Sequence, residues 1–144
     1  MASNNLLTKL EDAAKNVYVA TASAAIASFT GLSTDAVSVP CVVFSAQQGD
    51  ESVPGSYQFR CTLTITVKSN ADSTTITQHR DYVSDAFDLF MADDIDATLS
   101  GATGAQTDFT VTHVMSQRNI SERIEERMHV SEMQVHLIAC ANDI

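Results

Sequence analysis

The sequence has little positive charge and few cysteines. Eight Lys and Arg stand against 18 Asp and Glu, a formal net charge of -10 over 144 residues. A protein that grips the phosphates of a nucleic acid needs a basic patch, and the sequence contains no basic run. The three cysteines, Cys41, Cys61 and Cys140, form no CxxC pair. Their odd number and wide spacing favour buried free thiols in a reducing compartment over disulfides or a metal site.

Long apolar runs are missing too. Residues 17–29 are rich in alanine but are too short and too interrupted by Ser and Thr to span a bilayer. They do not fit a secretory signal either, because Glu11 and Asp12 precede them where a basic region would stand. We therefore expect a soluble protein made in the cytoplasm, with no membrane partner.

The common catalytic and metal-binding motifs are also missing. The sequence has no HExxH, no GxSxG and no Walker lysine motif. Its histidines show no paired spacing typical of a metal site. We expect structural roles for them, with His79 partly exposed on a helix, His113 and His136 in strands, and His129 in the polar part of the last hairpin. The sequence therefore predicts no catalytic residue, no metal and no cofactor, and hence no enzyme.

What the sequence does contain is a clear strand followed by a helix. From Tyr57 to Lys68, apolar and polar residues alternate, which predicts a half-buried strand. The small residues 69–73 predict a turn into a helix over about 75–91, with Ser73 or Thr74 as its cap. Apolar side chains recur in this helix at helical spacing, and its aspartates fall away from the apolar stripe.

The N-terminal part predicts a first helix. Asn4 or Asn5 can cap it, and the apolar residues of 6–17 recur every three or four positions. Residues 20–27 either continue this helix or begin another, and Gly31 is a candidate stop because glycine tolerates a left-handed C-cap.

A short apolar run at 41–44 predicts a second strand, with Pro40 at its entry. Glycine, proline and small polar residues predict loops at 47–56 and 99–107. The sequence leaves open whether these loops are ordered before the chain meets a partner.

The C-terminal third predicts a hairpin. Residues 109–115 alternate as a strand, 116–127 are polar, and 133–139 alternate as the last strand. The apolar positions switch from even to odd near Ser131–Glu132, which predicts a bulge there. A helical turn ending at about Met128 is the alternative. Together these elements predict a single domain, 1–144, of the α+β class, with a mostly antiparallel sheet packed against one N-terminal and one long helical segment.

The order of elements resembles the tail-terminator (tail-completion) proteins of tailed bacteriophages. Three stretches carry the resemblance: "VPCVVF" after the first helix, "QFRCTLTITVKSNAD" running into "ITQHRDYVSDAFDLF", and "HVSEMQVHLIACAND" as the last strand. The resemblance covers almost the whole chain and is one of pattern. These proteins share no invariant catalytic motif, so no active-site residue is carried over.

The resemblance implies a virion protein whose copies, typically six, close a ring that caps the tail tube and meets the neck of the head. It also implies tail-tube and neck proteins as partners, with assembly starting in the host cytoplasm. Genomic DNA would pass through the ring unbound, and carboxylates lining the lumen would repel its phosphates. The candidate lumen-facing residues are Asp81, Asp85, Asp88, Asp93, Asp94 and Asp96.

A second hypothesis concerns the polar segment 117–127, which we expect to contact other subunits or the tail tube. Its charged residues are Arg118, Glu122, Arg123, Glu125, Glu126 and Arg127. Three other interpretations stay open. The chain could be a head-closure or adaptor protein, a cytoplasmic oligomerisation or binding module unrelated to phage, or a small enzyme whose site is assembled between subunits.

Overall fold

The computed structural model describes residues 2–22, 26–31, 39–51, 54–55, 58–91, 95–100 and 109–141. Five strands form one sheet in the order β1-β2-β3-β5-β4. The strands are β1 (Ala27–Thr30), β2 (Cys41–Glu51), β3 (Gln58–Asn70), β4 (Phe109–Glu125) and β5 (Met128–Ala141). The helices are α1 (Ala2–Thr21), α2 (Ile76–Phe87), the 3-10 helix η1 (Asp88–Met91) and α3 (Ile95–Ser100).

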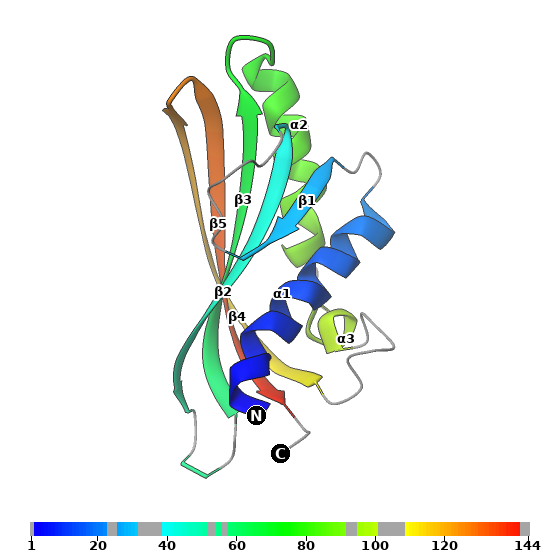
Figure 1. Ribbon diagram of the computed structural model, residues 1–144, viewed down its shortest axis with the longest axis vertical. Coiled ribbons are helices and arrows are strands. Elements are labelled where there is room, and N and C mark those ends of the chain that lie inside the picture. Colours follow the sequence, from blue (N-terminus) through cyan, green and yellow to red (C-terminus); the bar gives the residue numbers. More distant parts are fainter. Residues whose placement is uncertain are drawn as a thin grey trace.

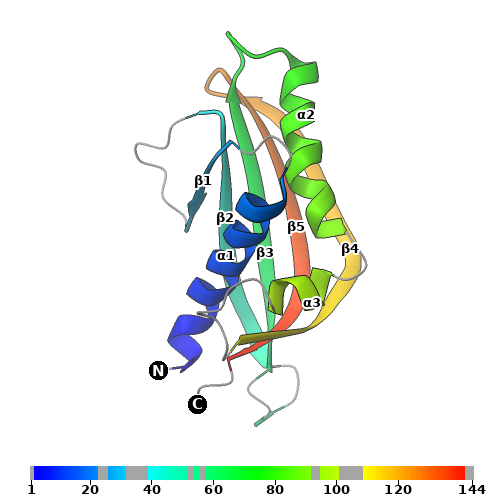
Figure 2. The same ribbon diagram turned by 90° about the vertical axis from the view of Figure 1, so that its right-hand side faces the viewer.

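All the described helices lie on one face of the twisted sheet (Figures 1 and 2). Neighbouring strands are antiparallel except for the short pairing of β1 with β2. No described helix covers the opposite face. The predicted α+β class is therefore confirmed, with helices on one face of a mostly antiparallel sheet.

The core lies between the helices and this inner face of the sheet. Alternate residues of β3 and β5 point inward, and α1 packs mainly against β2 and also against β5. Burying each large aliphatic side chain stabilises the fold by about 1.5–3 kcal/mol. Fully buried members include Leu6, Leu10, Ala13, Ala14, Leu63, Ile65, Val67, Met133, Val135, Leu137 and Ala139.

The N-terminal region differs from the prediction in two places. Helix α1 begins at Ala2, so Asn4 and Asn5 lie inside the helix and do not cap it. It ends at Thr21, and Ala27–Thr30 is the strand β1 where a helix was predicted. Hydrogen bonding to the edge of β2 outweighs the helical propensity of this segment. Gly31 does adopt a positive φ of 88°, but it follows a strand, and its N–H donates to Phe44 O at 2.9 Å.

The second strand is longer than predicted. β2 continues to Glu51, so residues 47–51 of the predicted loop belong to the sheet. The pairing with β3 shifts between Gln48 and Glu51. Gly49 lies at this irregularity, where an added Cβ would stand 3.1 Å from the carbonyl oxygen of Arg60. Glycine at 49 therefore permits a close approach of the two backbones within a bulge. Composition alone does not distinguish a glycine in a bulge from a glycine in a loop, and a loop was predicted here.

The central helix begins at Ile76, and its cap is Thr75, one residue after the later of the two predicted cap positions. The side chain of Thr75 caps α2 by accepting a hydrogen bond from Gln78 N–H at 3.2 Å. The 3-10 helix η1 extends the helical segment to Met91, close to the predicted end. Strand β3 runs to Asn70, two residues beyond its predicted end, and Tyr57 lies outside the described residues.

The predicted bulge near Ser131–Glu132 is wrong. Strand β5 pairs with β3 in an unbroken register from Met128 to Cys140. The switch from even to odd apolar positions arises because the inward positions of β5 next to the turn hold the polar His129 and Ser131, while Met128 and Val130 point to the opposite face. The turn between β4 and β5 consists of Glu126 and Arg127, with φ of 51° and 62°. Both values suit a tight hairpin. The register shifts of this hairpin lie in β4 instead, on either side of 113–114.

The cysteines are free thiols, as predicted, with Cys41 and Cys61 buried and Cys140 half-buried. Burial raises the pKa of all three, and that of Cys61 to about 11. At pH 8 roughly one Cys61 in a thousand is therefore a thiolate, the reactive form. We expect Cys61 to react with Ellman's reagent far more slowly in the native protein than in urea. Equal rates in the two conditions would contradict the buried placement.

Candidate functional site: an exposed edge strand and a buried histidine cluster

The predicted acidic residues lie on and after α2. Asp81, Asp85 and Asp88 recur at helical spacing along one stripe, with Asp81 and Asp88 exposed and Asp85 half-buried. Asp93 and Asp94 fall outside the described residues, as does the side chain of Asp96 in α3. Among the described residues no group of three or more His, Cys, Asp or Glu could hold a metal ion.

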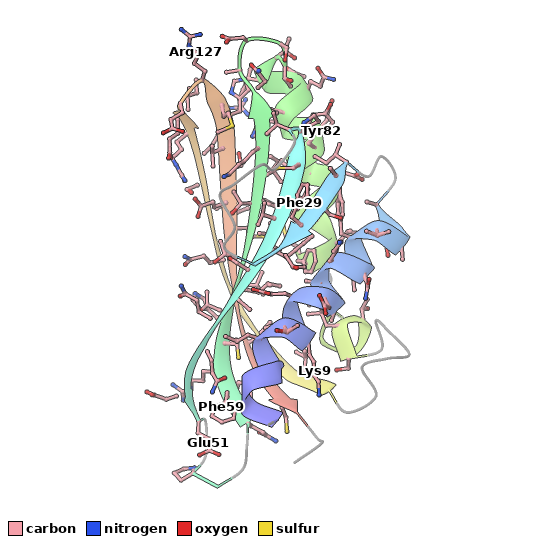
Figure 3. The ribbon with its side chains drawn as sticks, viewed as in Figure 1. Lys9, Phe29, Glu51, Phe59, Tyr82 and Arg127 are labelled. Carbon is pink, nitrogen blue, oxygen red and sulfur yellow. The ribbon has the colours of Figure 1, made fainter. Side chains whose placement is uncertain are left out.

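The charged residues of the predicted contact segment lie along β4 and its turn. Arg123 forms ion pairs with Glu125 and Glu132 within the same chain. Glu126 and Arg127 form the exposed turn, and Figure 3 places Arg127 at one end of the molecule with Glu51 at the other. The backbone of Arg118 lies in β4 opposite Val135, and its side chain falls outside the described residues.

Strand β4 forms one edge of the sheet. Among the described strands it pairs with β5 alone. At Val111 its backbone also bonds α3, because Ser100 Oγ accepts from Val111 N–H at 2.8 Å and donates to Val111 O at 3.2 Å. The part of the edge with no described partner therefore lies nearer the hairpin turn. Ile120 is 52% exposed and Ile124 is 70% exposed. Both share the inner face of the sheet, since they pair with the inward-facing Met133 and His129. We call β4 the exposed edge strand, and its exposed apolar side chains are these two isoleucines near the hairpin turn.

A second feature is a polar cluster within the inner face, which we call the histidine cluster: His79, His129, Ser69 and Ser131. The inner face is apolar along most of β3 and β5. At the end nearest the hairpin turn it becomes polar, because Ser69 pairs with His129 across β3 and β5, and Ser131 follows on β5. Helix α2 places His79 over these positions. All four side chains are buried.

His79 joins the helix to two strands. Its Nδ1 lies 2.7 Å from Ser69 Oγ on β3, and its Nε2 lies 2.9 Å from Ser131 Oγ on β5. A neutral imidazole has one N–H donor and one acceptor nitrogen, so one serine accepts and the other donates. The prediction that His79 is partly exposed is therefore wrong. Sequence reasoning placed it beside two charged neighbours, whereas the helix turns its side chain inward.

His129 stacks beside His79, with ring centroids 5.1 Å apart. Its Nε2 lies 3.1 Å from the carbonyl oxygen of Thr74. A carbonyl oxygen only accepts, so Nε2 carries the proton and Nδ1 carries a lone pair. That Nδ1 is buried with no hydrogen-bond partner among the described residues. His129 therefore lies in the polar part of the last hairpin, as predicted, and is buried there.

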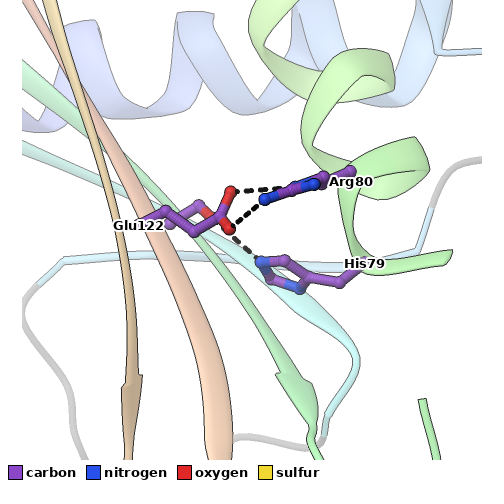
Figure 4. A network of polar contacts seen from close by, with 4 residues as sticks. His79, Arg80 and Glu122 are labelled. Carbon is purple, nitrogen blue, oxygen red and sulfur yellow. Dashed lines mark hydrogen bonds and ion pairs between the residues drawn. The ribbon is translucent and has the colours of Figure 1, made fainter. Parts of the chain in front are cut away.

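An ion pair lies at the rim of the cluster. Arg80 donates two hydrogen bonds to Glu122 of β4, Nε to Oε2 at 3.2 Å and Nη2 to Oε1 at 2.9 Å. Figure 4 shows Glu122 reaching from β4 toward both Arg80 and the ring of His79. The hydrogen bond from Arg80 is the main reason that the pKa of Glu122 is lowered. Glu122 therefore stays ionised beside the two rings.

The cluster contains serines, histidines and a carboxylate, the components of a nucleophilic triad, but its geometry does not suit catalysis. Ser69, Ser131 and His79 are each 1% exposed or less, so a substrate atom cannot reach a hydroxyl. His79 bonds a serine at each nitrogen, which leaves no nitrogen for an orienting carboxylate. The arrangement is a structural polar network. Ser69, Ser131 and His129 hold inward positions of their strands, and this alternation was the signal that could have revealed the cluster.

The uncovered face of the sheet is polar and shallowly hollowed. Threonines of β3 line it together with Gln134, Arg123 and Glu132. Toward the other end of this face, Thr62 Oγ1 lies 3.3 Å from His136 Nδ1.

None of the described helices is long and apolar enough to cross a membrane. In comparisons with known proteins, the chain matches no family model and no curated protein.

Proposed function

We propose that this chain is a structural virion protein of the tail-terminator kind. Its copies assemble into a ring, of six subunits in our proposal, that caps the tail tube and joins it to the neck of the head. The proposal rests on the sequence resemblance together with the exposed edge strand. Its partners are further copies of the chain, the tail-tube protein and a neck protein.

The exposed edge strand is the observation that carries the proposal. A long strand at the edge of a sheet can pair with a strand of another chain. Monomeric proteins usually have features that prevent such pairing. Here β4 runs from Phe109 to Glu125 and exposes two isoleucines near its end. Large aliphatic side chains exposed on an edge are typical of surfaces that become buried on assembly.

The acidic stripe supports the same function. Asp81 and Asp88 are exposed on α2 and η1, and the chain carries a net charge of -10. In a ring with α2 toward the lumen, each subunit would present these carboxylates to the passing DNA, and their repulsion of phosphates would prevent binding. This orientation is part of the proposal, and a ring structure with α2 on the outer wall would remove it.

We expect the purified chain to form a closed ring of about six copies, either alone or on tail tubes. The measurement is native mass spectrometry with particle images of the same sample. Six copies of 15.5 kDa correspond to 93 kDa. A monomer that also fails to bind purified tail tubes would contradict the proposal. A closed dimer with a deep shared cleft would favour the enzyme interpretation.

A further inference from the structure

We propose that the histidine cluster is a proton-operated latch, which holds the N-terminal half of α2 on the sheet when His79 is neutral and releases it when His79 takes up a proton. The inference concerns the folded chain itself and does not depend on the proposed function.

His79 is the anchor of the first part of α2. Within this helix, which the structure describes in full, the buried residues are His79, Ala86 and Phe87. The two buried apolar residues lie at the C-terminal end, and the half-buried Tyr82 and Val83 pack at the margin of the core in the middle of the helix. The first turn is therefore held mainly by the hydrogen bonds of His79 to Ser69 and Ser131, with Arg80–Glu122 at the rim.

The surroundings of His79 disfavour a proton on its ring. The charged or titratable groups that face it are His129 from β5, Glu122 from β4 and Arg80 from α2, whereas β3 contributes the neutral Ser69. Burial is the largest influence and lowers the pKa of His79. His129 and Arg80 lower it further, and Glu122 opposes them. Glu122 is shared with Arg80, so its charge is partly compensated.

The ring of His129 is the second buried group beside His79. Its Nε2–H donates to the Thr74 carbonyl, and its Nδ1 has no hydrogen-bond partner among the described residues. The two ring centroids lie 5.1 Å apart. A proton on His79 would therefore place a buried charge beside a ring that offers no compensating negative charge. Opening α2 exposes His79 to water and removes this cost.

The direction of the pH effect follows from linkage. The pKa of His79 is lowered in the closed state, so the open state binds more protons once the pH falls below the ordinary value of 6.5. The attachment of α2 is therefore complete above about pH 6.5 and weakens as the pH falls below that value. For each proton taken up on opening, the opening equilibrium rises at most about tenfold per pH unit.

Hydrogen–deuterium exchange of the full chain tests the latch. Exchange of the α2 amides would be followed by mass spectrometry at pH 7.5 and 5.5, corrected for the intrinsic pH dependence of exchange. We expect protection of the first half of α2 to fall by about tenfold or less at pH 5.5. Protection of the central β3 and β5 amides should change much less.

Two variants and one control decide the mechanism. His79→Gln removes the anchor ring, and the pH response of α2 should disappear. His129→Gln keeps the anchor but removes the neighbouring ring, and the response should shrink, so this variant serves if the first does not fold. His136→Gln is the matched control, because His136 lies half-buried on the opposite face beside Thr62 and should leave the response intact. A wild-type helix whose protection is the same at both pH values, or an equal response in all three variants, would overturn the latch.

Discussion

Replacing Phe44 with alanine is expected to lower the free energy of unfolding by about 3–5 kcal/mol, the usual range for truncating a fully buried phenylalanine. Phe44 lies on β2 with no exposed surface. Its ring centroid is 5.9 Å from that of Tyr18 on α1 and 5.8 Å from that of Phe90 on η1. The substitution would remove both ring contacts and leave a cavity where three elements meet.

The measurement is urea unfolding followed by far-UV circular dichroism at a fixed protein concentration, since assembly would shift the apparent stability. Phe59→Ala is the matched control. Phe59 lies on β3 and is half-buried at the margin of the core, so its truncation should cost clearly less. An equal loss for both variants would show that the three-ring contact does not hold the layers together.

The parts of this core that follow one strong period could be predicted from sequence. The strand around Leu63 and Ile65 and the apolar stripe of α1 both became buried as expected, because each repeats its pattern over several turns or rungs. The ring contacts of Phe44 could not be predicted. They depend on how three elements cross in space, and no local pattern encodes a crossing.

The errors lie where tertiary contacts override local preference. Residues 27–30 pair as a strand because the edge of β2 is available, although their neighbours favour a helix. The hairpin turn at Glu126 and Arg127 lacks glycine, asparagine and aspartate, so its sequence gives no turn signal. The bulge predicted near Ser131–Glu132 has a different cause, since the inward positions before Met133 hold the polar His129 and Ser131.

The histidine cluster was missed for a related reason. Because His79 stands beside Arg80 and Asp81 in the sequence, it was predicted to lie on a solvated helix face. Only the packing of α2 on the sheet shows that its side chain points inward. Ser69, His129 and Ser131 did hold inward positions of alternating strands. A polar residue at an inward position needs a partner, and that requirement is the sequence signal for a buried network.

Replacing both Ile120 and Ile124 with aspartate is expected to abolish assembly of the ring while the monomer stays folded. Each isoleucine is already partly buried, so its complete burial on assembly would contribute about 1–2 kcal/mol per interface. Losing both corresponds to a contact weaker by about thirtyfold or more, since about 1.4 kcal/mol is a factor of ten. The two side chains are largely exposed in the single chain, so the stability of the monomer should change little.

Val19→Asp is the matched control for this double variant. Val19 is 55% exposed, comparable to the two isoleucines, but it lies near the C-terminal end of α1, a helix that packs mainly against β2. Native mass spectrometry at one concentration should give monomers for the double variant and rings for Val19→Asp, and circular dichroism should show both folded. Rings that persist in the double variant would exclude this part of β4 from the subunit contact. Rings lost in both variants would indicate that added negative charge, and not the edge strand, governs assembly of this acidic chain.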